Sequence, residues 1–149
     1  MKWIMVANSN DCRIYEYDKN VKQLTLIDEI YHPENKLKVH DFVTDHSGHY
    51  KSGGSSRGSY EPEMNLKDVA IDSFAREMAM RLDVGRTKHA YDDLTLLMPP
   101  AMEGLLTKHL NKHIMSSIHR IIQKNLMHLS EYELKKYLCK ALINGGVMH

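Results

Sequence analysis

"WIMVANSNDCRIYEYDKNVKQLTLIDEIY", residues 3–31, carries the clearest structural pattern in the chain. It contains three runs rich in β-forming residues, and two short polar turns separate them. The runs are Trp3–Ala7, Cys12–Tyr17 and Gln23–Tyr31. Because tight polar turns join strands of opposite direction, the pattern predicts an antiparallel meander. Pro33 follows the third run and ends it, because proline has no backbone N–H to donate to a sheet.

Downstream of the meander, a long helix is predicted from about Glu63 to Leu82. Its apolar side chains recur near helical spacing, which indicates one buried face. They are Val69, Phe74, Met78 and Leu82. Gly85, just past the last of them, is the expected stop of the helix.

The rest of the chain alternates between one apolar strand and two shorter helices. "DDLTLLMPP", residues 92–100, predicts a buried strand that ends at two prolines. Residues 101–110 and 130–142 predict helices. In the second of these, Ser130 and Glu133 have the spacing of a capping box, and two glycines after residue 144 end it.

Residues 115–129 allow two interpretations. The isoleucines and leucine of "SIHRIIQKNLMHL" fit an amphipathic helix, while alternate residues of the same segment fit a strand. Periodicity by itself favours the helix.

Length and composition limit the class of protein. A chain of 149 residues with 42% hydrophobic and 26% charged residues predicts one domain with a single core. The net charge of +1 gives no overall attraction to nucleic acid or to a membrane, so any such contact needs a local patch. The two cysteines lie far apart, which argues against a disulfide framework. With no apparent signal peptide and no long apolar run, we expect a cytoplasmic protein that does not enter a membrane.

One segment departs from the pattern of a packed domain. "HSGHYKSGGSSRGSYEP", residues 46–62, has four glycines and five serines and no aliphatic side chain. It predicts a flexible loop over about residues 44–60. Long loops in small domains are usually functional or disordered.

Five stretches, taken in order, resemble a known bacterial family. They are "KWIMVANSNDCRIYEY", "LTLIDEIYHPENKLKVHDFVTDHSGHYKSGG", "SFAREMAMRL", "YDDLTLLMPPAMEGLLTKHL" and "IIQKNLMHLSEYEL". The chain resembles the host attachment protein family, whose description is "protein required for attachment to host cells". That family is similar to the middle domain of archaeal and eukaryotic class-1 release factors. The resemblance implies an α/β (α+β) fold with a mixed five-stranded, ribonuclease H-like sheet and helices packed on it. It also implies a strand over residues 117–126.

The same resemblance suggests a role for the loop. In release factors a Gly-Gly-Gln tip in a similar place enters the ribosome, and Gly53 and Gly54 match the paired glycines. Ser55 stands where glutamine is expected, which argues against peptidyl-tRNA hydrolysis. Lys51 and Arg57 flank the glycines and suit phosphate contacts. We therefore expect a non-catalytic module that binds ribosomal or other structured RNA and carries no cofactor.

Two other functions remain open from the sequence. The loop residues Asp45, His46 and His49 offer carboxylate and imidazole groups for a metal-dependent hydrolase. A nuclease with two metals is less favoured, because Asn8 ends the first strand where this family typically has an aspartate. The third function is that of a protein-interaction or attachment factor. A solvated loop without any ligand is the plainest alternative to all of them.

A second cluster of basic residues lies in "TKHLNKH", residues 107–113. Its members are Lys108, His109, Lys112 and His113. The two histidines have the i, i+4 spacing that can hold zinc, but no glutamate follows the first one, so a metalloprotease motif is absent. Together with Arg120 and Lys124, these side chains predict a secondary basic patch for an acidic partner, against the alternative of an ordinary solvated face.

Overall fold

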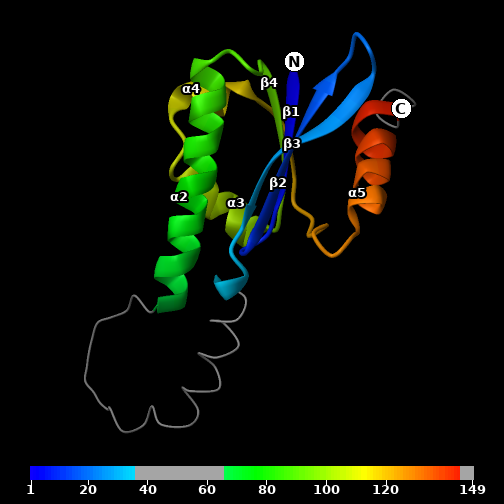
Figure 1. The fold of residues 1–149 in the computed structure, drawn as a ribbon. Helices are drawn as coiled ribbons and strands as arrows, with labels where there is room; N and C mark the ends of the chain where they lie inside the picture. The colour runs from blue at the N-terminus through cyan, green and yellow to red at the C-terminus, as the bar shows by residue number, and fades with distance from the viewer. Residues whose placement is uncertain (36–65, 145–149) are drawn as a thin grey trace, which may run out of the picture.

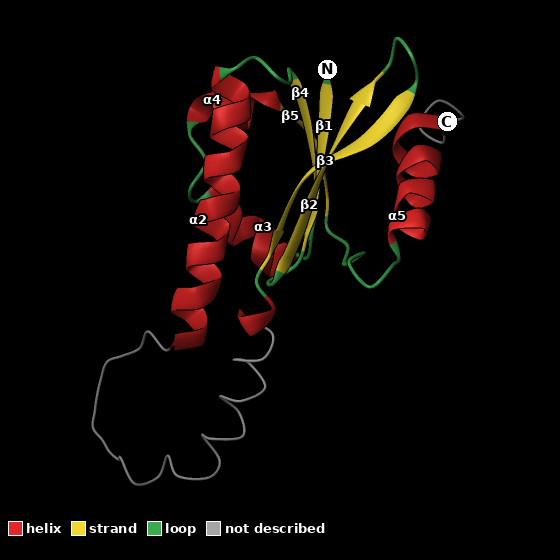
Figure 2. Ribbon diagram, in the orientation of Figure 1, coloured by secondary structure: helices red, strands yellow, loops and turns green. Residues whose placement is uncertain are grey.

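The computed structural model describes residues 1–35 and 66–144. One five-stranded sheet lies at the centre, and helices cover both of its faces (Figures 1 and 2). The strands are β1 Lys2–Ala7, β2 Asp11–Asp18, β3 Gln23–Tyr31, β4 Asp93–Leu97 and β5 Ile118–Ile122. The helices are α2 Leu66–Thr87, α3 Pro100–Thr107, α4 Lys112–Ser117 and α5 Glu131–Leu138, and a π-helical segment, Cys139–Asn144, follows α5.

The sheet has the strand order β3-β2-β1-β4-β5. β1, β2 and β3 pair antiparallel, as the meander predicts, while β4 pairs parallel to β1 and β5 parallel to β4. The expectation of an α/β protein with a mixed five-stranded sheet is therefore confirmed. Only β2 runs against the other four strands. The carboxyl ends of β1, β3, β4 and β5 consequently share one edge of the sheet, called the carboxyl edge below.

Strand β1 is buried on both faces because it lies in the middle of the sheet. Trp3 and Met5 pack in the core between the sheet and α2, whereas Ile4 and Val6 pack in the core beneath α5. This alternation explains why β1 is apolar at every position from 3 to 7, which is typical of central strands covered on both sides.

Helix α2 closes the first core. Phe74, Met78 and Leu82 are fully buried there, which confirms the predicted apolar face. Val69 does not belong to that face, because it is 46% exposed. The predicted stop at Gly85 is wrong: the helix continues through this glycine to Thr87. Gly85 is buried in α2, where a side chain would meet the β1 strand.

Helix α5 closes the second core, on the other face of the sheet. Leu134, Leu138 and Leu142 pack there against Ile4 and Val6. The predicted capping box is present: the Ser130 hydroxyl accepts a bond from the Glu133 amide, and the Glu133 carboxylate accepts one from the Ser130 amide. The α-helix ends at Leu138, before the predicted end at residue 142, because the chain continues as a π-helix. No described helix is long and apolar enough to span a membrane.

The ambiguous segment forms α4 and then β5, so the strand implied by the family resemblance is confirmed over Ile118–Ile122 and the helical interpretation of these residues is wrong. The register of β5 against β4 shifts between Leu94 and Thr95. Ile118 consequently packs in the α2 core while Ile122 packs in the α5 core. This irregularity breaks the alternation expected of a strand and leaves a spacing that resembles a helix.

Candidate functional site at the carboxyl edge

Several polar segments meet at the carboxyl edge. Asn8 follows β1, His32 follows β3, Pro99 follows β4, and Asn125 lies three residues after β5. A helical turn at residues 33–35 and the start of α2 lie at this same end of the molecule (Figure 1). In open α/β sheets, ligands bind outside the carboxyl ends of the strands. The carboxyl edge is therefore the candidate position of a ligand site.

The predicted loop residues lie outside the described part of the chain. They are Asp45, His46, His49, Lys51, Gly53, Gly54 and Arg57. Their role in RNA or metal binding stays a prediction. The structure does place the two residues that bracket this segment: Asn35 lies in the helical turn at residues 33–35, and Leu66 is the first residue of α2.

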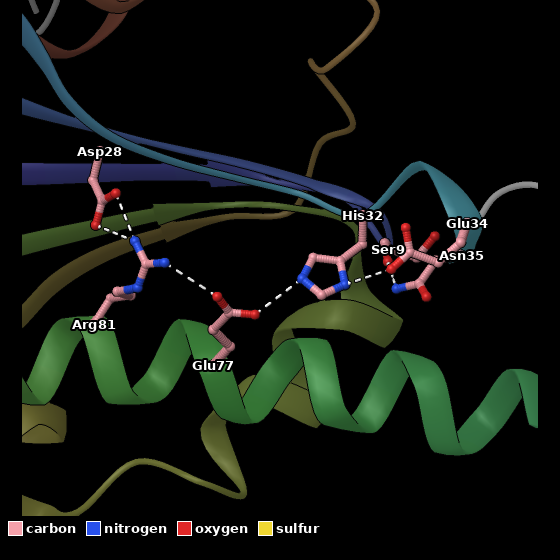
Figure 3. A network of polar contacts seen from close by, with 7 residues as sticks. All are labelled: Ser9, Asp28, His32, Glu34, Asn35, Glu77 and Arg81. Atoms are coloured by element: carbon pink, nitrogen blue, oxygen red, sulfur yellow. Dashed lines mark hydrogen bonds and ion pairs between the residues drawn. The ribbon is translucent and has the colours of Figure 1, made fainter.

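A chain of ion pairs ties the end of β3 to α2, as Figure 3 shows. The Arg81 guanidinium donates to both oxygens of Asp28, at 2.6 and 2.7 Å, and to Glu77 at 3.1 Å. The other Glu77 oxygen lies 3.0 Å from His32 Nε2. The hydrogen bond that Arg81 donates to Asp28 is the main reason that the pKa of Arg81 lies above its ordinary value. The network holds β3 in a fixed position against the helix.

His32 lies at the end of this chain of ion pairs, three residues before Asn35. Its Nδ1 lies 3.0 Å from Glu34, so both ring nitrogens face carboxylates (Figure 3). Only the doubly protonated ring can donate to both of them. The ring also meets Phe74 edge to face, with centroids 5.2 Å apart. His32 thus connects the residues just before the segment 36–65 to α2, which follows that segment in the chain.

Asn35 fixes the same segment to the first turn of the sheet. Its side chain donates to the Ser9 carbonyl at 3.0 Å, and the residue is only 2% exposed (Figure 3). The sequence does not predict the roles of His32 and Asn35, because "HPEN" indicates only the end of the meander. The sequence around Asn35 gives no sign that its side chain is buried, since its hydrogen-bond partner, Ser9, lies 26 residues away in the chain.

Asn8 has a structural task at this edge. Its side-chain oxygen accepts hydrogen bonds from the amides of Asn10 and Asp11, at 2.9 and 2.8 Å. Its own amide donates to the Asp11 carbonyl at 2.9 Å. The side chain therefore closes the turn between β1 and β2, which is a common use of asparagine in turns.

A pocket of about 360 Å³ opens beside this turn, and we call it the edge pocket. It lies between the turn after β1, the start of α3 and the first turns of α2. Within residues 1–35 and 66–144, its lining residues are Asn8, Ser9, Ile71, Pro99, Ala101, Met102, Leu105 and Asn125. None of them is ionisable, so the pocket combines apolar walls with neutral polar groups.

At the carboxyl edge, the described residues offer neither a metal site nor a reactive thiol. Within residues 1–35 and 66–144, no three His, Cys, Asp or Glu side chains are placed to hold a metal ion. Cys12 is fully buried, and burial raises the pKa of its thiol far above the ordinary value. A buried, protonated thiol is a poor nucleophile and a poor ligand.

The second predicted site is only partly as expected. Lys108, Lys112 and His113 are exposed, and none of them has an ion-pair partner within the described ranges. His109 differs, because its Nε2 lies 2.8 Å from Asp72 of α2. The zinc-like spacing is not realised on one helix: His109 lies between α3 and α4, and His113 lies in α4.

The pairing of His109 has electrostatic consequences. Hydrogen bonds from His109 and from Arg76 lower the pKa of the Asp72 carboxyl. A cleft of about 370 Å³ adjoins these groups, and Asp83 and Asn111 also line it. Because α4 directly precedes β5, Lys112 and His113 lie near the amino ends of the parallel strands, away from the carboxyl edge.

Comparison with known proteins identifies the chain at the level of its family. Residues 3–138 match the model of the family described as "Protein required for attachment to host cells". The chain belongs to this host attachment family. The resemblance expected from the sequence is thereby confirmed for the family itself. No curated protein matches the chain by sequence.

The fold also resembles that of solved structures. One of them is described as an archaeal protein and aligns with a TM-score of 0.51 at 10% sequence identity. The alignment covers 94% of this chain and 33% of the archaeal one, so the chain spans about a third of the length of that protein. At this identity the likeness concerns the fold alone, and the relationship of the host attachment family to release factors stays a prediction.

Proposed function

We propose that this host attachment family protein is a non-catalytic module that binds structured RNA through the segment between Asn35 and Leu66. The observation that carries the proposal is that the residues directly before this segment are anchored to the folded domain. Asn35 is buried on the β1–β2 turn, and His32 is bound to α2 through Glu77. A segment rich in glycine and in cations thus departs from a fixed platform at the edge where ligands of such sheets bind.

The chemistry of the segment supports RNA over a neutral partner. Lys51 and Arg57 supply cations for phosphates, and Gly53 and Gly54 leave backbone N–H groups open to close approach. The exposed cations Lys108 and Lys112 offer further phosphate contacts, at the other end of the molecule. The proposal therefore makes the segment after Asn35 the main contact and the basic patch an auxiliary one.

The release-factor relationship belongs to this proposal. A mixed sheet in which only β2 runs against the others supports a ribonuclease H-like, release-factor middle-domain type of fold. Ser55 in place of glutamine supports binding without peptide release. A ribosomal or other structured RNA as partner implies a cytoplasmic location.

The test is RNA binding over a salt series with the variant Lys51→Ala/Arg57→Ala. If these cations contact phosphates, the variant binds about tenfold more weakly at low salt, and its salt slope falls by about one unit for each lost contact. The control variant, Lys19→Ala/Lys88→Ala, removes two exposed cations elsewhere on the surface. It should bind as the wild type does. Equal affinities of all three proteins at every salt concentration would refute the proposal.

A further inference from the structure

An electrostatic contact with RNA phosphates does not explain the apolar walls and neutral polar groups of the edge pocket. We propose that it binds one unpaired nucleobase. The inference rests on the proposed function, because an RNA held by the segment after Asn35 would present its bases at this edge. It goes further by naming the part of the RNA that enters the protein and the residues that receive it.

The uncharged lining of the pocket favours a neutral group of the ligand. None of the eight residues that line it within the described part of the chain is ionisable. By contrast, the cleft near His109 is lined by Arg76 and Asp83 as well. Because a phosphate leaves water only where cations or several N–H donors receive it, an uncharged pocket favours a base over the backbone.

The walls of the pocket suit a flat apolar surface. Ile71 of α2 and Met102 and Leu105 of α3 line it together with Pro99. Proteins that extract a base from a stack hold it between aromatic or apolar side chains. A volume of about 360 Å³ lies within the range of small-molecule sites.

The polar groups of the pocket give the base its hydrogen bonds. The side-chain oxygen of Asn8 accepts from two backbone amides, and that of Asn125 accepts from the Met127 amide at 3.3 Å. These bonds fix which end of each side chain is the oxygen. The NH₂ groups of both asparagines are then the remaining donors, and no other described residue is bonded to them. Donors of this kind match the carbonyl and ring-nitrogen acceptors of base edges.

The position of the pocket between strand ends supports the same conclusion. Asn8 follows β1, Pro99 follows β4, and Asn125 follows β5, so three parallel strands end around it. This is the place where the chain turns from β1 towards β2 on one side and from β4 towards β5 on the other. Crevices at such reversals are the usual ligand sites of open α/β sheets.

The experiment fills the pocket and compares two neighbouring positions of one helix. Ala101 lines the pocket and is exposed, so Ala101→Trp places an indole in it without disturbing the core. Gly104 lies in the same helix, where a Cβ would meet nothing within 4 Å, and Gly104→Trp is the matched control. The probes are the four free nucleosides, an RNA hairpin with an unpaired loop, and a fully paired duplex of equal length.

The expected result is that Ala101→Trp weakens binding of at least one nucleoside and of the hairpin by about tenfold or more, while duplex binding stays unchanged. Gly104→Trp should bind all probes as the wild type does. Asn125→Asp is the second variant: it keeps the acceptor for the Met127 amide and replaces the donor by an oxygen. It should also lose nucleoside binding while its melting temperature stays that of the wild type.

The outcomes separate this inference from the proposed function. If Lys51→Ala/Arg57→Ala loses RNA while Ala101→Trp and Asn125→Asp bind every probe normally, the RNA-binding proposal stands and the base pocket is wrong. If the wild type binds no RNA but binds a nucleoside, and Ala101→Trp abolishes this nucleoside binding, the base pocket stands and the RNA-binding proposal is wrong. If the wild type binds no nucleoside and the hairpin no better than the duplex, the base pocket is refuted.

Discussion

The indole of Trp3 lies directly against the backbone of Gly85. A Cβ built on this glycine would come within 2.3 Å of Trp3 Cη2 and 2.7 Å of Cζ3. Tyr91 also packs against the indole, with ring centroids 4.6 Å apart, and its hydroxyl donates to the Leu82 carbonyl at 2.7 Å. The distance between β1 and α2 is therefore set by a glycine inside a helix, where an alanine would otherwise be preferred.

Replacing this glycine should destabilise the protein. Gly85→Ala gains helix propensity but forces a methyl group into a bulky aromatic ring, and overpacking typically costs about 1–3 kcal/mol. We expect a net loss of about 1–2 kcal/mol in urea unfolding. The matched control is Gly104→Ala in α3, where the added methyl group meets no neighbour and should stabilise the protein by up to about 1 kcal/mol. Equal effects of both changes would contradict the packing argument.

The ion pair between Arg81 and Asp28 should contribute measurably to stability. Both side chains are about one-third exposed, so solvent weakens the pair but does not cancel it. Arg81→Met should lower the free energy of unfolding by about 1 kcal/mol, since it also leaves Asp28 and Glu77 without their shared cation. In the control Arg76→Met, the removed cation is 69% exposed, and the change should stay within about 0.5 kcal/mol. The measurement is urea unfolding at neutral pH.

Asp72 should make stability depend on pH in acid. Hydrogen bonds from His109 and Arg76 lower the pKa of its carboxyl in the folded state. The unfolded state then binds the proton first, so the contribution is fully present above the ordinary aspartate pKa of about 4 and is lost as the pH falls through the folded value. Wild type should therefore lose more stability than Asp72→Asn between about pH 5 and pH 2. Parallel curves for the two proteins would show that the pair contributes nothing.

Ser55 should leave the protein unable to release peptides. The sequence has Gly53 and Gly54 but no glutamine after them, so it lacks the side chain that the release-factor resemblance requires for peptidyl-tRNA hydrolysis. Purified protein in excess over ribosomes that carry peptidyl-tRNA should leave the ester intact. Hydrolysis that a Gly54→Ala change abolishes would contradict the non-catalytic proposal.

The parts of the fold that depend on local sequence patterns could be predicted. The three strands of the meander and the capping box at Ser130 each depend on residues close in the chain, and the structure has them as predicted. The central position of β1 follows from its apolar character on both faces. Sequence periodicity does not predict β5, because the register shift between Leu94 and Thr95 disturbs the alternation of buried and exposed side chains. Only the family resemblance favours a strand here.

The candidate site was less accessible to sequence reasoning, because its contacts join distant residues. Asn35 meets Ser9 across 26 residues, and His32 meets Glu77 across 45. Gly85 was interpreted as a helix stop because its packing against Trp3 leaves no trace near it in the sequence. The edge pocket likewise draws on α2, α3 and three strand ends, and no single motif contains its residues.

Asn8 allows the structural and the binding roles of the carboxyl edge to be separated. Its oxygen holds the amides of Asn10 and Asp11, so Asn8→Ala should destabilise the protein by about 1 kcal/mol. Asn8→Asp keeps an oxygen acceptor for both amides and should unfold at nearly the same urea concentration as the wild type. The same change replaces an amide donor by a negative charge beside the edge pocket.

Because of that charge, Asn8→Asp should bind RNA several-fold more weakly although it folds normally, and the loss should shrink as salt is added. The measurements are urea unfolding of both variants and hairpin affinity of Asn8→Asp at two salt concentrations. An Asn8→Asp protein that folds and binds like the wild type would mean that this edge does not face the RNA. An Asn8→Asp protein as unstable as Asn8→Ala would mean that the turn needs the amide itself, since the acceptor oxygen is common to asparagine and aspartate.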